Sequence, residues 1–234
     1  MGKPKNEARA AWATSEDAAA KKRRARLALR RLERAYPSST TALRHQNPFE
    51  LLVATVLSAQ STDKKINEIT QTLFAKYRSP QDYLAAAPGE LEQDIKQSGF
   101  FNQKARSIRG LSAALIERFG GEVPATLAEL VTLPGVARKT ASVVLWNAFG
   151  RNEGIAVDTH VHRLSWRLAL SDHDDPNKVE RDLMELIPRA KWGILTHVLI
   201  DHGRAVCLAR APRCADCVVN DLCPASRVPA RRAR

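Results

Sequence analysis

The sequence predicts an all-α fold, because apolar residues recur at helical spacing along most of the chain and strand-like alternation is almost absent. Hydrophobic residues make up 44% of the 234, enough for one large or two small domains with a core. No apolar run approaches the roughly 20 residues needed to span a bilayer, and no secretory signal is recognisable. We therefore expect a cytoplasmic protein without a membrane partner.

Basic residues are concentrated at the two ends of the chain. The formal net charge is +12, and residues 1–36 hold 11 Lys/Arg against 4 Asp/Glu. Residues 224–234 add four Arg and no acid, so the body between the ends is nearly neutral. This excess indicates a polyanionic partner, although solvated basic tails without a specific role would give the same charge.

The first half of the chain reads as a series of helices after a polar start. Residues 1–20 lack an apolar period and are expected to form a disordered basic tail. Asn47-Pro48 opens a clear helix, whose apolar stripe begins at Phe49 and is extended by Gln60. The segment 99–102 is predicted to be a turn. Ser61, Thr62 and Asp63 offer N-caps for a next helix, whose apolar face runs from Ile66 to Phe74. Other helical patterns in this half cover residues 21–36, 80–87, 90–97 and 104–119.

The second half contains two helical patterns joined by a tight hairpin turn. Helices over 126–130 and 138–149 are joined through Pro134-Gly135, which permits a sharp reversal. Because the second helix starts at once, its first amides are free, and together with the helix dipole they favour a phosphate. An ordinary αα-hairpin is the alternative. Later helical patterns cover residues 159–170, 177–187 and 194–202.

All four cysteines lie within the last 28 residues of the chain, spaced Cys207-x6-Cys214-x2-Cys217-x5-Cys223. In a reducing compartment such crowding indicates a metal site rather than disulfides. Four thiolates suit either an iron–sulfur cluster or a structural zinc ion, and the spacing alone leaves both open.

Four segments, taken in order, resemble the endonuclease III family. They are Leu-Ser-Ala-Gln-Ser-Thr-Asp (57–63), the hairpin Leu-Pro-Gly-Val-Ala-Arg-Lys-Thr-Ala (133–141), Val-Asp-Thr-His-Val-His-Arg (157–163) and the cysteine run. The resemblance spans about residues 21–224 and implies two helical domains flanking a DNA-binding cleft. One would be a six-helix barrel with the helix-hairpin-helix, over 41–153. The other would be an iron–sulfur domain, over 21–40 and 154–234.

The resemblance implies that Lys139 is the nucleophile and Asp158 its partner. In that family the lysine attacks the anomeric carbon of a damaged nucleotide, expels the base and forms a Schiff base. A catalytic amine must shed its proton, and desolvation with the positive end of a helix favours the neutral form. The alternatives are a solvated surface lysine at 139 and a helix N-cap at Asp158.

The resemblance also implies that Gln60 and Phe100 enter the duplex once a nucleotide has been flipped out. Such flipping costs a few kcal/mol, which a wedge in the gap partly offsets. Glutamine can hydrogen-bond a base edge, and phenylalanine can stack. Alternatively, Gln60 caps the end of its helix and Phe100 packs in the core, and Phe101 competes with Phe100 for the wedge position.

Further DNA contacts are expected from the hairpin residues Gly135, Ala137 and Arg138, and from Arg210 and Arg213 in the loop before the second cysteine. The resemblance favours a [4Fe–4S] cluster on Cys207, Cys214, Cys217 and Cys223. The sequence departs from the family pattern at a few positions, which puts substrate range and rate in doubt. Ala137 replaces a glycine, Ser142 and Trp146 replace asparagines, and Phe100 replaces a leucine.

The expected activity is a monomeric, bifunctional DNA glycosylase and AP lyase that excises oxidised pyrimidines from duplex DNA, or acts on abasic sites, and nicks the strand by β-elimination. Two alternatives remain. An adenine-mispair glycosylase of the same superfamily lacks the lysine and carries a further C-terminal domain, whereas this chain ends eleven residues after Cys223. A non-catalytic DNA-binding module would not need both Lys139 and Asp158.

Overall fold

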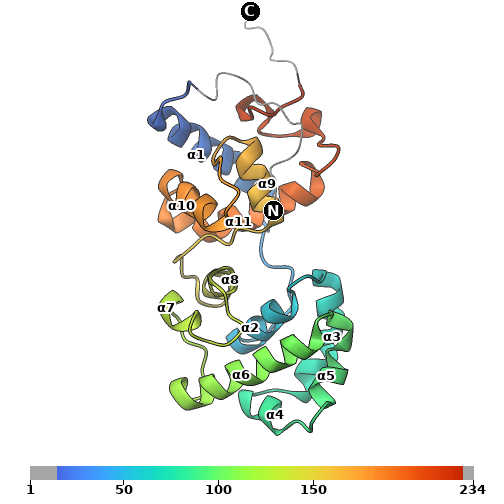
Figure 1. Ribbon diagram of the computed structural model, residues 1–234. Coiled ribbons are helices and arrows are strands. Elements are labelled where there is room, and N and C mark those ends of the chain that lie inside the picture. Colours follow the sequence, from blue (N-terminus) through green and yellow to red (C-terminus); the bar gives the residue numbers. More distant parts are fainter. Residues whose placement is uncertain (1–14, 229–234) are drawn as a thin grey trace, which may run out of the picture. The chain divides into compact units, whose positions relative to one another are not determined.

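The computed structural model describes residues 15–228 and folds them into helices and turns, without a strand. The chain divides into two compact units (Figure 1). The central unit is Thr41–Glu153, and the terminal unit combines Met1–Thr40 with Gly154–Arg234. Each unit has its own core of buried apolar side chains. The all-α fold class is confirmed, and no helix in the described part of the chain is long and apolar enough to cross a membrane.

The central unit is built around α2, which is apolar on all sides. Eight of its ten residues are buried, as expected for a helix enclosed by others. Asn47 accepts a hydrogen bond from the Glu50 amide at 2.9 Å and so caps the helix, and Pro48 occupies its first turn. The helices of this unit are α2 (Pro48–Leu57), α3 (Asp63–Lys76), α4 (Pro80–Ala85), α5 (Glu90–Asp94), η2 (Lys96–Ser98), α6 (Phe101–Phe119), α7 (Leu127–Leu130) and α8 (Arg138–Phe149).

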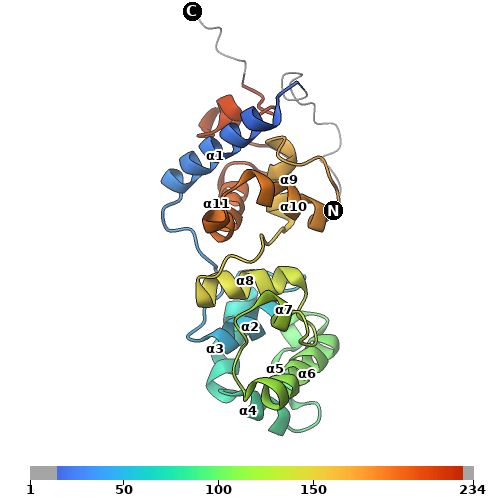
Figure 2. The same cartoon turned by 90° about the vertical axis from the view of Figure 1, so that its left-hand side faces the viewer.

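In the central unit α2 packs against α8, α3 and α6, and in both views it lies between α8 and α6 (Figures 1 and 2). The predicted helix over 138–149 is found with the same ends. The prediction that Gln60 extends the stripe of α2 is wrong, because α2 ends at Leu57. The predicted turn over 99–102 is also shorter than expected, because α6 already begins at Phe101.

The terminal unit joins the two ends of the chain. Helix α1 packs against α11 and α10, and α11 packs against α9 (Figure 2). Leu29 and Leu32 of α1 thereby share a core with Leu164, Leu195 and Val198. The helices of this unit are α1 (Ala18–Ala35), α9 (Thr159–Arg167), α10 (Pro176–Leu186), η3 (Arg189–Lys191), α11 (Trp192–Ala205), η4 (Cys214–Asp216) and η5 (Asn220–Leu222).

Helix α1 begins earlier than the sequence predicts. The expected disordered tail over 1–20 is wrong for its last residues, because Asp17 caps α1 and residues 18–20 are helical. Residues 1–14 lie outside the part that the structure describes. Glu16 forms a largely buried ion pair with Arg24 at 2.7 Å, and Arg24 also donates to the Leu168 carbonyl at 2.6 Å. This contact across 144 residues fixes the start of α1.

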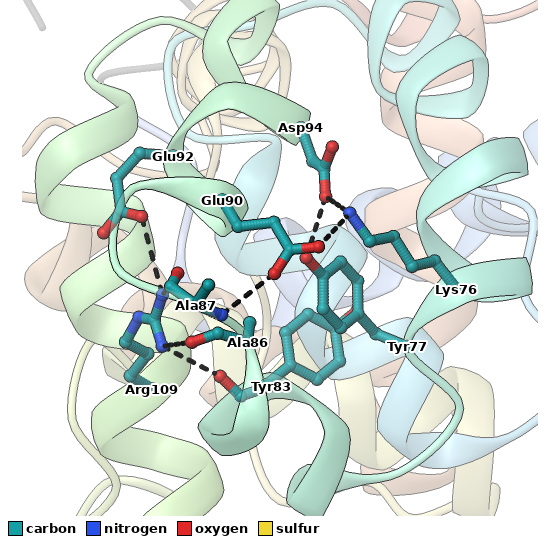
Figure 3. Close-up of polar contacts among 9 residues, drawn as sticks. All are labelled: Lys76, Tyr77, Tyr83, Ala86, Ala87, Glu90, Glu92, Asp94 and Arg109. Atoms are coloured by element: carbon teal, nitrogen blue, oxygen red, sulfur yellow. Dashed lines mark hydrogen bonds and ion pairs between the residues drawn. The ribbon is translucent and has the colours of Figure 1, made fainter.

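A polar network joins α3, α4, α5 and α6 at one end of the central unit (Figure 3). Lys76 at the end of α3 pairs with Glu90 and Asp94 of α5, at 2.8 and 2.6 Å. Tyr77 donates to the same Asp94 oxygen at 2.8 Å, and burial together with this bond raises the pKa of Tyr77 to about 12. Arg109 of α6 donates to the carbonyls of Tyr83, Ala86 and Ala87, and so satisfies the open end of α4.

Two neighbouring tyrosines in this region differ in how their hydroxyls are satisfied. The rings of Tyr77 and Tyr83 stack with centroids 4.8 Å apart, and both side chains are buried. The Tyr77 hydroxyl donates to Asp94, whereas the buried Tyr83 hydroxyl has no hydrogen-bond partner among residues 15–228. An unsatisfied buried hydroxyl costs roughly 1–3 kcal/mol, so the two hydroxyls contribute to stability with opposite sign.

We predict that Tyr83→Phe leaves the thermal midpoint unchanged or raises it, because only an unsatisfied hydroxyl is lost. The matched variant Tyr77→Phe should lower stability by about 1 kcal/mol, or the midpoint by about 2–4 °C, because Asp94 loses a donor. Differential scanning calorimetry of the two variants measures this. A larger loss in Tyr83→Phe than in Tyr77→Phe would contradict the assignment.

Candidate functional site

The turn between α7 and α8 is seated closely on α6. Gly135 has φ +76°, a left-handed conformation that favours glycine. A Cβ atom at this position would lie 2.6 Å from the Cβ of Ser107 on α6. A Cβ on Gly110, also in α6, would meet Pro134 at 3.0 Å. The Pro134-Gly135 turn is therefore set both by backbone conformation and by the absence of side-chain atoms at two close approaches.

The N-cap residue of helix α8 has no side chain that could cap the first amides of the helix. Its N-cap residue is Ala137, with φ −80° and ψ 165°, and it makes no side-chain cap hydrogen bond. This conformation is open to any residue, so alanine fits where the family pattern has glycine. Open first-turn amides and the positive end of the helix dipole form a site suited to a phosphate oxygen.

Lys139 is the second residue of α8, beside the open amides. Both Arg138 and Lys139 are exposed in the central unit. The Ser142 side chain is buried and donates to the Arg138 carbonyl at 3.0 Å, which leaves it directed along the helix rather than outward. The first turn of α8 thus presents two cations next to a site for an anion.

Asp158 belongs to the terminal unit, where it caps α9. Its Oδ1 accepts hydrogen bonds from the amides of His160 and Val161, both at 2.8 Å. The N-cap alternative from the sequence therefore describes this residue correctly. Its second oxygen, Oδ2, has no hydrogen bond to a described residue, and the side chain is half-buried. One carboxylate oxygen holds the helix and the other stays available.

Gln60 and Phe100 lie in the central unit, and both have left-handed backbone conformations, with φ 57° and 49°. Such conformations are rare for residues other than glycine and cost roughly 1–3 kcal/mol each. Both side chains are exposed, Phe100 by 64%. Phe101 instead packs against the core, so it does not compete for the exposed position. The Gln60 side chain makes no hydrogen bond to a described residue, so it does not cap α2.

The four cysteines line one small cavity in the terminal unit, together with Arg167, Val206, Pro212, Arg213, Asn220, Ala225 and Ser226. All four are free thiols and partly buried. Within residues 15–228, no group of three or more His, Cys, Asp and Glu side chains is arranged to hold a single metal ion. Four thiols around one cavity are the donor set that an iron–sulfur cluster needs.

Two buried side chains, those of Arg167 and His202, contact these cysteines. Arg167 donates to the Cys207 sulfur at 3.2 Å, and to the carbonyls of Leu208 and Ala209 at 2.7 and 2.9 Å. The Nε2 of His202 lies 3.3 Å from the Cys217 sulfur. Burial raises the pKa of Cys217 to about 11, so this thiol keeps its proton at neutral pH unless a metal displaces it.

The two arginines of the cysteine loop differ in their surroundings. Arg213 donates to the Ala205 carbonyl at 2.5 Å and lies 3.7 Å from Asp216, so it ties the loop to the end of α11. Arg210 is exposed and makes no hydrogen bond or ion pair with the described residues. Of the two, Arg210 is the one with its guanidinium available to a phosphate.

Sequence reasoning missed Lys104 and Arg167, both buried and both bonded to backbone carbonyls. A helical pattern could have indicated Arg167, because Arg163 lies one turn before it and also donates to the Cys207 carbonyl. No local pattern marks Lys104 as buried. Its acceptors are on Leu57 and Ser98, and only the fold brings them together.

Comparison with known proteins identifies the family. Residues 53–189 match the HhH-GPD superfamily base excision DNA repair proteins. Endonuclease III of Synechocystis sp. is 48% identical over 209 residues, which are 89% of this chain and 95% of that protein. Endonuclease III of Bacillus subtilis is 50% identical over 189 residues, or 80% of this chain and 86% of that protein.

A solved structure of a non-covalent endonuclease III–DNA complex has a TM-score of 0.83 to this chain at 47% identity, covering 88% of this chain and 96% of that one. Sequence and structure thus agree over most of the length. The chain therefore belongs to the HhH-GPD superfamily of base excision DNA repair proteins and, within it, to the endonuclease III family of DNA glycosylases and AP lyases.

Proposed function

We propose that this enzyme excises oxidised pyrimidines from duplex DNA and cleaves the resulting abasic strand by β-elimination, acting as a cytoplasmic monomer on nucleoid DNA. The observation that carries the proposal is the position of Lys139, in the first turn of a helix whose amides are open to a phosphate. Phosphate binding there would hold the damaged strand beside a primary amine.

The proposed chemistry begins with the nitrogen lone pair of Lys139. It forms a bond to the anomeric carbon, and the bond from that carbon to the base breaks, so the base leaves with the electron pair and takes up a proton. The amine then loses a proton, the bond between the anomeric carbon and the ring oxygen breaks, and that oxygen takes up a proton, which leaves a Schiff base between Lys139 and the opened sugar. Removal of a proton from the adjacent carbon then expels the 3′ phosphate, which nicks the strand.

The amine must be neutral before it can attack. Lys139 is exposed within its own unit, so we infer that bound DNA supplies the desolvation which favours the neutral form. The free oxygen of Asp158 is suited to accept the proton, directly or through water, and to stabilise positive charge on the sugar.

We also propose that Gln60 and Phe100 fill the space left by the flipped nucleotide. Their exposure and left-handed backbones support this role, because within residues 15–228 neither side chain belongs to a core cluster or makes a hydrogen bond. Further phosphate contacts are assigned to Gly135, Ala137, Arg138 and Arg210. Arg213 is proposed to act mainly by holding the cysteine loop in place, in view of its contacts with Ala205 at the end of α11 and with Asp216.

The cysteine cavity is proposed to hold a [4Fe–4S] cluster bound by Cys207, Cys214, Cys217 and Cys223. Arg167 supports this assignment, because a buried cation beside Cys207 would offset part of the negative charge of four thiolates. When bound, the cluster would supply a cross-link between segments of the terminal unit. The chain's own residues would then keep the loop with Arg210 in a fixed position.

Replacing Lys139 by glutamine should abolish the covalent adduct that borohydride traps between the enzyme and abasic DNA, because the amide nitrogen cannot form an imine. Duplex binding should persist, since the open amides of α8 are unchanged. Lys64→Gln, which removes one exposed charge from the same unit, should still give the adduct. Adduct formation by Lys139→Gln at the wild-type level would rule out this nucleophile.

Asp158→Asn separates the two duties of that residue. The asparagine side chain still accepts from the His160 and Val161 amides, so α9 and the thermal midpoint should be retained, while excision slows by about 10²–10⁴-fold. Asp158→Ala should lose both functions, with a stability cost of about 1 kcal/mol. Wild-type excision by a folded Asp158→Asn would show that the carboxylate charge is not needed.

The cluster assignment predicts about four iron atoms per chain and a broad absorption band near about 400 nm in the purified protein. Cys214→Ala should lose both. Ser226→Ala, which changes the same cavity without removing a thiol, should keep both. Zinc in place of iron, with no visible band, would overturn the assignment because zinc has a filled d shell.

A further inference from the structure

Lys104 is a buried lysine that has no acidic partner in the part of the chain that the structure describes. Its side chain lies in the first turns of α6 and the residue is 6% exposed. The Nζ atom donates to two backbone carbonyls, those of Leu57 and Ser98, both at 2.7 Å. No ion pair involves it within residues 15–228. Burial lowers the pKa of this amine, so the site costs free energy that an apolar side chain would not.

The two carbonyls that Lys104 binds belong to segments with a shared role in the proposed function. Leu57 is the last residue of α2, three residues before Gln60. Ser98 is the last residue of η2, two residues before Phe100. One ammonium group therefore fixes the end of α2 and the end of η2 to each other, with the two carbonyl oxygens no further apart than twice the length of one hydrogen bond.

Lys104 also holds Phe100 through its backbone. The Lys104 amide donates to the Phe100 carbonyl at 3.1 Å, while its ammonium binds the carbonyl two residues earlier. Lys104 thus binds the backbone both at Phe100 and two residues before it. Left-handed conformations at Gln60 and Phe100 persist only if the surroundings impose them, and this clamp acts on both turns at once.

We propose that Lys104 is a positioning residue that couples the Gln60 turn to the Phe100 turn, so that the two side chains enter the duplex together. The inference rests on the proposed function of Gln60 and Phe100. A purely stabilising role fits the site less well. Moving an ammonium group from water into an apolar interior costs desolvation free energy, and a packed methionine in its place would avoid that cost. What the ammonium provides and methionine cannot is a fixed geometry between two carbonyls.

The test is a double-mutant cycle on base excision under single-turnover conditions. In the wild-type background, Gln60→Ala and Phe100→Ala should each slow excision, and their combined effect should differ from the product of the single effects by about fivefold or more. In a Lys104→Met background, the combined effect of the two substitutions on the excision rate should equal the product of their single effects. Cleavage of a preformed abasic site should be less affected by Lys104→Met than excision, because an abasic nucleotide is easier to extrude.

A second readout follows the duplex itself. The duplex carries 2-aminopurine opposite the lesion, and Lys139→Gln blocks the chemistry. Binding of this enzyme should raise the fluorescence as the reporter base loses its stacking, and the rise should be smaller when Lys104→Met is added. Ile108→Val, one turn further along α6 and fully buried, is the matched control. It should lower stability by a similar order while leaving both the coupling and the fluorescence rise unchanged. A merely structural role for Lys104 would move the melting temperature and not these signals.

The outcomes separate the two proposals. Wild-type coupling in Lys104→Met would overturn the clamp and leave the wedge intact. Failure of Gln60→Ala and Phe100→Ala to slow excision at all would overturn both. Should Lys104→Met not fold, Lys104→Gln takes its place. Its side chain is one bond shorter and uncharged, so it cannot donate two charge-assisted hydrogen bonds at the position of Nζ; the coupling should weaken, and unchanged coupling in that variant would equally overturn the clamp.

Discussion

The arrangement of the central unit depends on the close approach between the Pro134-Gly135 turn and α6. Because a Cβ at Gly135 would collide with Ser107, the turn seats on α6 only with glycine there. That seat determines where α8 begins, and hence where its open amides and Lys139 lie. The same helix, α6, carries Lys104, which binds the end of α2 and the loop before Phe100. One helix thus positions the proposed nucleophile, the phosphate site and both wedge residues.

The candidate residues lie at helix ends, and the reason is physical. Helix termini leave amides and carbonyls without partners inside the helix, so they are the places where the backbone can bind an anion or accept an outside donor. Lys139 is at the start of α8, Asp158 caps α9, and Gln60 and Phe100 stand just beyond α2 and just before α6. Each therefore gains its direction from a rigid helix while remaining outside the packed core.

The local sequence predicted those helix boundaries that are determined by interactions between residues close in the chain. Apolar spacing and caps gave α8 with both ends correct and α2 with its start correct. The ordered motifs identified the family and so singled out Lys139, Asp158 and the cysteines as candidate site residues. The errors arose where distant residues decide. Arg24 and Glu16 pull the start of α1 forward through a bond to Leu168, and a side chain 47 residues away holds the end of α2 short of Gln60. No periodicity records such contacts.

The cysteine loop shows how a cofactor site can depend on the opposite end of the chain. The His202 ring joins the Tyr36 hydroxyl, 2.9 Å from Nδ1, to the Cys217 sulfur, 3.3 Å from Nε2. Arg31 of α1 pairs with Asp221 in the same loop at 2.6 Å. Four thiolates carry more charge than a buried cavity tolerates without compensation. Because the contacts of His202 and Arg31 are already formed, bringing the four thiolates together costs less free energy. Helix α1 is therefore part of the proposed cluster's support, which explains physically why a segment starting before residue 20 folds against residues near the other end of the chain.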